Sequence, residues 1–228
     1  MALPIILLEF DDVLAETRVL RAGALRSALA PDGVALTDDV YETSCAGLSF
    51  VAAARAACRA TRVSVDETAI ELAALRADRE YARRAARGLA LSGGAADFVR
   101  GAAGVARLGL VTRSARRDIS RLLAFAALED VFECVVTEED YRGEEPSSEP
   151  FALCRMRLAR RAPVALGEGA ALVSSLGAAA AARGARFRPV IVGPVQAPVA
   201  FGGDGWLPTL DGATVSDVMR IADGAQAS

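Results

Sequence analysis

The second half of the chain alternates apolar runs of strand length with helical patterns, and this alternation limits the fold more than any other feature. The apolar runs lie at residues 107–112, 133–137, 163–168 and 189–193. The helical patterns lie at residues 95–103, 116–126 and 150–160, and in an alanine-rich stretch that follows residue 168 and ends near Arg183. Strands that alternate with helices in this way predict βαβ units. We therefore expect an α/β fold with a doubly wound, Rossmann-like parallel sheet.

Another strand precedes these units. Residues Pro4–Phe10 form an apolar run without polar alternation, which is typical of a central parallel strand buried on both faces. The run leads into an acidic cluster of Glu9, Asp11 and Asp12. Ligands of open α/β sheets bind at the carboxyl ends of the strands, so acids at this place indicate a metal or phosphate site. The alternative interpretation is a solvated acidic cluster that binds no ligand.

The region between the first strand and the alternating half has a different character. Residues 16–87 are rich in alanine and arginine, and their apolar residues recur at helical spacing. Breaks at residues 30–33, 45–49 and 61–67 divide the region into about four helices. We therefore expect a helical domain of residues 16–87, inserted into a core formed by residues 1–15 and 88–228.

The residue types that are missing exclude several kinds of active site. The sequence has 228 residues and no histidine, and its 26 positively charged residues are all arginine. A Ser-His-Asp triad, a histidine metal ligand and a Schiff-base lysine therefore cannot form within this chain. General acid and base chemistry is left to Asp, Glu, Tyr or Cys.

Charge and cysteine content limit the partners and the location that we expect. The net charge is −3, which predicts no nucleic-acid partner. The four cysteines contain no C-x-x-C pair, so neither a zinc site nor a disulfide framework is expected. The amino-terminal apolar run is too short to span a bilayer and no basic segment precedes it, so we expect a cytoplasmic protein without a membrane anchor. The sequence does not indicate an oligomeric state.

Three further strand ends carry polar side chains. Thr112 ends the run at 107–112, Glu145 lies in the loop after the next strand, and Glu168 ends the run at 163–168. Thr112 also suits a plain helix cap, because a helix follows it. Together with Glu9, these residues would gather at one edge of the predicted sheet.

These motifs resemble those of the haloacid dehalogenase superfamily, in the subgroup with a helical cap that includes β-phosphoglucomutase and phosphoglycolate phosphatase. In that family the first strand ends in D-x-D-G-V-L-x-D-T, and this sequence has E-F-D-D-V-L-A-E-T from Glu9 to Thr17. Residues 143–150 represent the family's G-K-P-x-P-D, and residues 167–169 represent its (E/D)-D-S. The resemblance covers nearly the whole chain and implies that residues 16–87 are the cap.

The resemblance implies a phosphatase or phosphomutase that acts on a small phosphorylated metabolite. Glu9 stands at the position of the nucleophile and Asp11 at the position of the acid/base. Thr112 matches the hydroxyl that binds the transferred phosphoryl group, and Glu145 stands where the family has a lysine.

The resemblance also implies a Mg²⁺ ion. Its ligands would be Glu9, Asp11 and Glu168, all of which offer the oxygen atoms that this cation prefers. An alternative alignment of the fourth motif puts Val173 or Ser174 in the place of Glu168.

Two departures from the family pattern bear on catalysis. The extra methylene of Glu9 displaces the attacking oxygen by on the order of 1 Å, which slows transfer roughly a hundredfold or more. Glu145 reverses the charge of the family's lysine, and only an arginine such as Arg142 or Arg113 is left to replace it. The favoured hypothesis is a catalytically impaired protein, either a pseudoenzyme or a ligand-binding module. The alternative is an active Mg²⁺-dependent phosphatase or phosphomutase.

Overall fold

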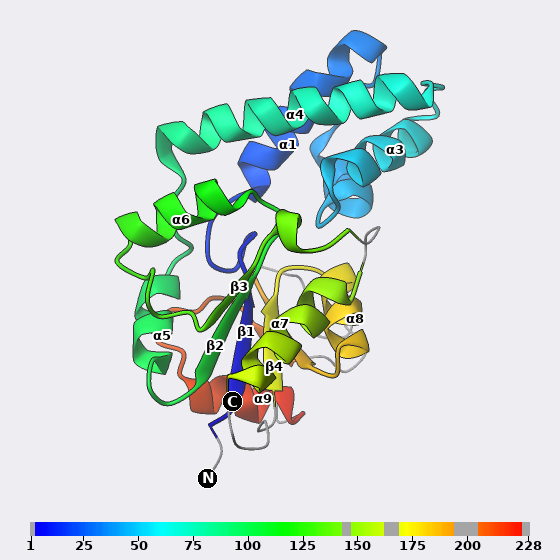
Figure 1. Ribbon diagram of the computed structural model, residues 1–228. Coiled ribbons are helices and arrows are strands. Elements are labelled where there is room, and N and C mark those ends of the chain that lie inside the picture. Colours follow the sequence, from blue (N-terminus) through cyan, green and yellow to red (C-terminus); the bar gives the residue numbers. More distant parts are fainter. Residues whose placement is uncertain (1–2, 143–146, 162–168, 194–204, 225–228) are drawn as a thin grey trace. The chain divides into compact units, whose positions relative to one another are not determined.

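The computed structural model describes residues 3–142, 147–161, 169–193 and 205–224 (Figure 1). Contacts divide the chain into two compact units. One unit consists of Met1–Ala15 and Leu91–Ser228, and the other of Glu16–Ala90. The first unit contains a sheet with helices, and the second is helical.

The first unit is built on a parallel sheet. Within the described residues the sheet has six strands in the order β3-β2-β1-β4-β5-β6, and every neighbouring pair is parallel. The strands are β1 (Ile5–Glu9), β2 (Arg107–Val111), β3 (Cys134–Val136), β4 (Gly169–Val173), β5 (Arg188–Val192) and β6 (Gly205–Leu207). The chain adds β2 and β3 on one side of β1 and then adds β4 on the other side, so the winding reverses between β1 and β4. This order confirms the predicted doubly wound parallel sheet.

Strand β1 lies at the centre of the sheet because it is apolar almost to its end. Residues Ile5–Leu8 are fully buried between β2 and β4. The register places Glu9 beside Val111 and Leu8 beside Leu172. The carboxyl ends of β1, β2 and β4 therefore meet at the same edge of the sheet.

Helices cover both faces of this sheet (Figure 1). The helices of the unit are α5 (Ala95–Ala102), α6 (Arg116–Phe125), α7 (Glu149–Arg160), α8 (Leu176–Gly184) and α9 (Val215–Ala222). Helices α7 and α8 contact each other and the sheet, and they bury Phe151, Cys154 and Ala179 in one apolar cluster with residues of the strands. Helix α9 packs on β4 and β5 and contacts α5.

The position of β4 corrects one prediction. Residues 163–168, where we expected this strand, lie outside the described residues, and the strand occupies Gly169–Val173, where we expected helix. All five of its residues are buried between β1 and β5. Small side chains suit this place, because a Cβ atom at Gly169 would lie 2.8 Å from the ring of Phe187. Tertiary burial thus overrides the helix propensity of the two alanines in this strand.

The second unit packs its helices around a separate apolar cluster. Its helices are α1 (Arg18–Leu29), α2 (Asp38–Val40), α3 (Phe50–Thr61) and α4 (Glu67–Gly88), with short turns η1 (Ala30–Asp32) and η2 (Tyr41–Cys45). Ser49 and Asp66 cap α3 and α4 by accepting backbone hydrogen bonds, so these helices begin where the sequence breaks. The buried Arg21 guanidinium lies 4.4 Å from the ring centre of Phe50.

No helix among the described residues is both long enough and apolar enough to cross a bilayer.

Candidate functional site

Polar side chains gather at the edge of the sheet where β1, β2 and β4 end. Glu9 is the last residue of β1, Thr112 follows β2, and Ser174 follows β4. Asp11 lies two residues beyond β1 and is 3% exposed. The structure thus brings together the predicted residues Glu9, Asp11 and Thr112. Ser174, which the alternative alignment of the fourth motif names, joins them.

Both carboxylate oxygens of Glu9 are held by donors from neighbouring segments. Oε2 accepts hydrogen bonds from the backbone N–H and from the hydroxyl of Ser174, each at 2.8 Å. Oε1 lies 3.4 Å from Nη2 of Arg113, a weak ion pair whose two side chains are 5% and 15% exposed. Burial raises the pKa of the Glu9 carboxyl above its ordinary value, and Arg113 and Ser174 oppose this rise.

A second set of contacts joins Asp11 to the loop after β2. The Thr112 hydroxyl donates to Oδ2 of Asp11 over 3.4 Å, and the backbone N–H of Ser114 donates to the Thr112 hydroxyl at 3.0 Å. The Ser114 hydroxyl is buried and has no hydrogen-bond partner among the residues that the structure describes. A buried hydroxyl of this kind is costly unless a ligand or a water satisfies it.

A tight turn places Asp11 beside β2. Asp12 has a positive φ of 61°, and its N–H donates to the carbonyl of Ala15 at 2.8 Å. The N–H groups of Leu14 and Ala15 both donate to the carbonyl of Phe10. Asp tolerates this left-handed conformation better than most residues, so the chain turns here without the glycine of the family pattern.

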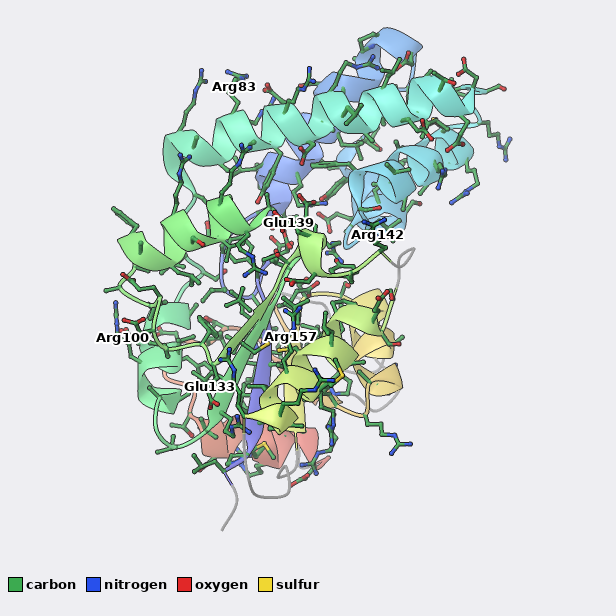
Figure 2. The ribbon with its side chains drawn as sticks, in the orientation of Figure 1. Arg83, Arg100, Glu133, Glu139, Arg142 and Arg157 are labelled. Carbon is green, nitrogen blue, oxygen red and sulfur yellow. The ribbon has the colours of Figure 1, made fainter. Side chains whose placement is uncertain are left out.

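Two predicted site residues cannot be placed. Glu145 and Glu168 lie outside the described residues, in the gaps 143–146 and 162–168. Of the two arginines proposed to replace the family's lysine, Arg113 contacts Glu9, whereas Arg142 is exposed beyond η3 (Glu138–Asp140; Figure 2). Strand β4 ends at Val173, so Ser174 stands at its carboxyl end, as the alternative alignment has it.

Glu9 and Asp11 are the two predicted Mg²⁺ ligands that lie among the described residues. Residues 3–142, 147–161, 169–193 and 205–224 contain no group of three metal-ligating side chains. The Glu9 oxygens already accept bonds from Ser174 and Arg113. A magnesium ion is commonly held by one or two carboxylates together with waters, and the Glu9 carboxylate would have to give up a protein donor to become one of them.

A network that sequence reasoning missed fixes the helix after Arg113. The carboxylate of Glu139 accepts a hydrogen bond from the backbone N–H of Arg116 at 3.0 Å, at the start of α6. Asp140 pairs with Arg116 and with Arg157 of α7, the latter at 2.8 Å. Burial alone would raise the pKa of Asp140, but bonds from Arg157 and Thr137 lower it to about 2. The T-x-x-D pattern of a capping box was the signal for this network.

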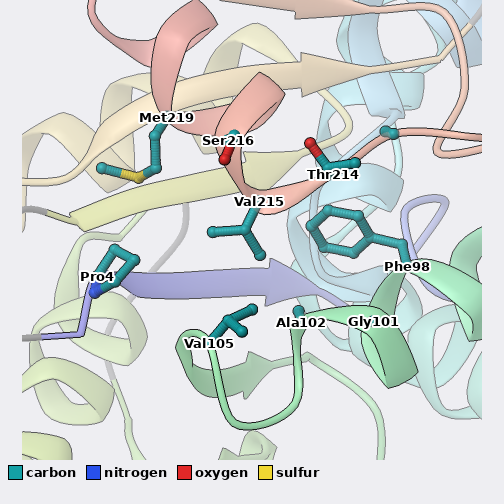
Figure 3. A pocket seen from close by; sticks show the side chains of 10 residues that line it. Pro4, Phe98, Gly101, Ala102, Val105, Thr214, Val215, Ser216 and Met219 are labelled. Carbon is teal, nitrogen blue, oxygen red and sulfur yellow. The ribbon is translucent and has the colours of Figure 1, made fainter.

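A cavity of about 410 Å³ lies at the other end of the sheet (Figure 3). Its lining includes Pro4, Phe98, Val105 and Met219, and no charged side chain of the described residues is among the lining. Pro4 precedes β1, so the cavity is about 16 Å from Glu9 along this strand. The cavity is therefore separate from the acidic site.

Comparisons with known proteins agree with this fold. The sequence pattern of the family described as haloacid dehalogenase-like hydrolase matches residues 6–164. CbbY from Rhodobacter sphaeroides in complex with phosphate is similar, with a TM-score of 0.76, 20% identity, and coverage of 95% of this chain and 99% of that one. A CbbY mutant in complex with xylulose-(1,5)bisphosphate gives a TM-score of 0.74 at the same identity and coverage.

A further solved structure is similar over nearly its whole length. The β-phosphoglucomutase of Clostridium difficile has a TM-score of 0.77 and 13% identity, and the match covers 97% of each chain. At identities this low the likeness shows a shared fold. No curated protein matches the sequence.

Proposed function

Because this chain belongs to the haloacid dehalogenase-like hydrolase family, we propose that it binds a small phosphorylated metabolite at the strand ends but does not transfer phosphoryl groups through Glu9. One observation carries the proposal. Both oxygens of the carboxylate at the nucleophile position are engaged by protein donors, from Ser174 and Arg113. The protein is then a pseudoenzyme that serves as a ligand-binding module.

An engaged and buried carboxylate is a poor nucleophile for three reasons. Its lone pairs on Oε2 point at the two donors of Ser174 and not at a ligand. Burial raises its pKa above the ordinary value, so the charged form that attacks phosphorus is less favoured than in a free glutamate. Its extra methylene also moves the attacking oxygen by on the order of 1 Å from the aspartate position, and such a displacement costs about a hundredfold in rate.

The same edge of the sheet keeps groups that bind phosphate oxygens. Thr112 and Ser114 carry hydroxyls, and Arg113 carries a guanidinium with several donors. The similar CbbY structures contain phosphate and xylulose-(1,5)bisphosphate, which supports a phosphorylated metabolite as the ligand class. Under this proposal the site keeps side chains that bind a phosphate group but lacks a nucleophile that attacks its phosphorus atom.

A second candidate function is an active Mg²⁺-dependent phosphatase or phosphomutase. The observation that favours it is the retained pair of Asp11 and Thr112, 3.4 Å apart, at the positions of the acid/base and the phosphate-binding hydroxyl. Under this hypothesis Glu9 or Asp11 acts in an altered role, and Glu168, outside the described residues, completes the site.

Hydrolysis of an aryl phosphate in the presence of Mg²⁺ separates the two functions. We expect no turnover by the native protein, and a gain of turnover in a Glu9→Asp, Glu145→Lys double variant. Native turnover that Asp11→Ala abolishes would contradict the pseudoenzyme. The control is Asp97→Ala, which removes an exposed carboxylate from α5 and should change nothing. Thermal-shift titration with a panel of sugar phosphates tests binding, which Thr112→Val should weaken.

We further propose that the helical unit Glu16–Ala90 acts as the cap that selects the metabolite, in the sense that the family resemblance implies. Protein with the unit intact but with altered surface residues should change its preference among sugar phosphates while keeping its affinity for inorganic phosphate.

We also propose a cytoplasmic location, since the four cysteines are buried free thiols, which a reducing compartment preserves.

A further inference from the structure

The guanidinium of Arg113 places a positive charge of the protein itself within the site. Nη2 of Arg113 lies 3.4 Å from Oε1 of Glu9, and both side chains are largely buried. A divalent cation bound to that oxygen would sit within a few ångströms of the guanidinium, and the two positive charges would repel in a region that water screens poorly. Arg113 therefore opposes a metal at the place where the family resemblance puts one.

Ser174 also disfavours a metal ion at this place. It stands at the end of β4, beside Glu9, where an acidic residue would be needed to bind a metal. Instead it offers a neutral hydroxyl and a backbone N–H, and both are donors to Glu9. Donors stabilise a carboxylate without a metal, because they replace the positive partner that the carboxylate needs.

Ser114 supplies a second, independent observation. Its side chain is 5% exposed, and its hydroxyl has no hydrogen-bond partner within the described part of the chain. It lies one residue after Arg113, and its backbone N–H donates to the Thr112 hydroxyl at 3.0 Å. A buried hydroxyl donor, one residue along the chain from an arginine, matches the acceptor-rich oxygens of a phosphate group.

We infer that Arg113 takes the place of the divalent cation, so that Arg113, Thr112 and Ser114 bind a phosphate group without a metal. This inference rests on the proposed binding function and specifies how the same site neutralises its ligand. Asp11 and Glu9 remain as acids in the site, and the guanidinium offsets one of these charges. The ligand class is a phosphomonoester or inorganic phosphate, bound through its terminal oxygens.

Calorimetric titration with inorganic phosphate, in EDTA and then in Mg²⁺, tests the inference on the native protein. We expect equal affinity under both conditions. Arg113→Gln should weaken binding by about tenfold or more, because it removes a charge-assisted hydrogen bond. The matched control is Arg121→Gln, which removes the same charge from an exposed position on α6 and should leave the affinity unchanged. Circular dichroism verifies that both variants fold.

Electron paramagnetic resonance of added Mn²⁺ gives a direct readout of metal binding to the native protein. Phosphate binding that requires Mg²⁺, or stoichiometric Mn²⁺ binding that Glu9→Gln removes, would overturn the inference and leave the proposed binding function standing. Absence of binding under both conditions, for inorganic phosphate and for sugar phosphates alike, would overturn the binding function as well.

Discussion

Ser174 donates two hydrogen bonds to a single oxygen of Glu9, one from its backbone N–H and one from its hydroxyl, both 2.8 Å long. The two residues stand at the ends of neighbouring strands, β1 and β4, where the winding of the sheet reverses. In α/β sheets this reversal opens the crevice that receives ligands. Here two residues of the protein contact each other at that place.

This contact predicts a measurable contribution to stability. Ser174→Ala removes the hydroxyl bond to a buried carboxylate and leaves the backbone bond in place. We expect it to lower the free energy of unfolding by about 1.5 to 3 kcal/mol, as for a hydrogen bond to a charged group. Ser120→Ala, at an exposed position on α6, is the control in urea denaturation. Equal midpoints for the two variants would show that the hydroxyl bond contributes nothing.

Glu9 predicts a dependence of stability on pH. Its pKa is raised in the folded protein, first by burial, so the folded state holds this proton more tightly than the unfolded state does. The contribution of Glu9 is therefore fully present below the ordinary glutamate value of 4.5 and is lost as pH rises through the higher folded value. We expect the free energy of unfolding of the native protein, relative to that of Glu9→Gln, to fall as pH rises above 4.5. Denaturation curves at several pH values measure it, and a difference that grows with pH would contradict the assignment.

Gly94 occupies a backbone position where a side chain would be strained and would clash with a neighbouring segment, which predicts a large loss of stability on substitution. It is the N-cap residue before α5 and has a φ of 74°, and a Cβ atom there would lie 2.3 Å from the backbone nitrogen of Asp211. Gly104 has a similar φ of 80° but no atom within 4 Å of such a Cβ. We expect Gly104→Ala to cost about 1 kcal/mol for the left-handed conformation, and Gly94→Ala about 3 kcal/mol or more because the clash adds to it. Thermal unfolding of both variants measures the difference, and equal losses would mean that the backbone near Asp211 yields easily.

The sheet was predictable from the sequence where apolar runs were bounded by turns, as in β1 and β2. It was not predictable at β4, because two of its five residues are alanine and an apolar run of that composition suits a strand and a buried helix equally. Burial on both sides decides between them, and burial is a property of the folded chain. The error put the expected strand end at Glu168, whereas the strand ends at Val173 and Ser174 follows it.

The sequence predicted which strand ends meet at the candidate site, but not the side-chain contacts within it. Asp11 and Thr112 lie together because parallel strands end at one edge of the sheet, which topology alone requires. The bond from Ser174 to Glu9 joins residues 165 positions apart and depends on their side-chain rotamers, which a single sequence does not determine. Arg113 was one of two candidates, and only its contact with Glu9 distinguishes it from Arg142.

We expect a glycine substitution after the end of α6, at Ala127, to stabilise the protein. Ala127 has a positive φ of 53°, and the N–H of Leu128 donates to the carbonyl of Leu123 at 2.8 Å, which is the hydrogen-bond pattern of a Schellman motif. Glycine is the usual residue at this place, since a Cβ atom disfavours the left-handed conformation by about 1 to 2 kcal/mol. The greater freedom of glycine in the unfolded chain offsets part of this gain, so we expect Ala127→Gly to raise the free energy of unfolding by about 0.5 to 1 kcal/mol.

The matched control for this substitution is Ala124→Gly, three residues earlier and also exposed, but inside α6. The same change of side chain there should lower stability by about 0.5 to 1 kcal/mol, because glycine loses more freedom than alanine in a helix. Opposite signs for the two variants in urea denaturation would establish that α6 ends in the left-handed turn at Ala127. Destabilisation by both would place Ala127 in the helix and would remove the Schellman motif from the fold.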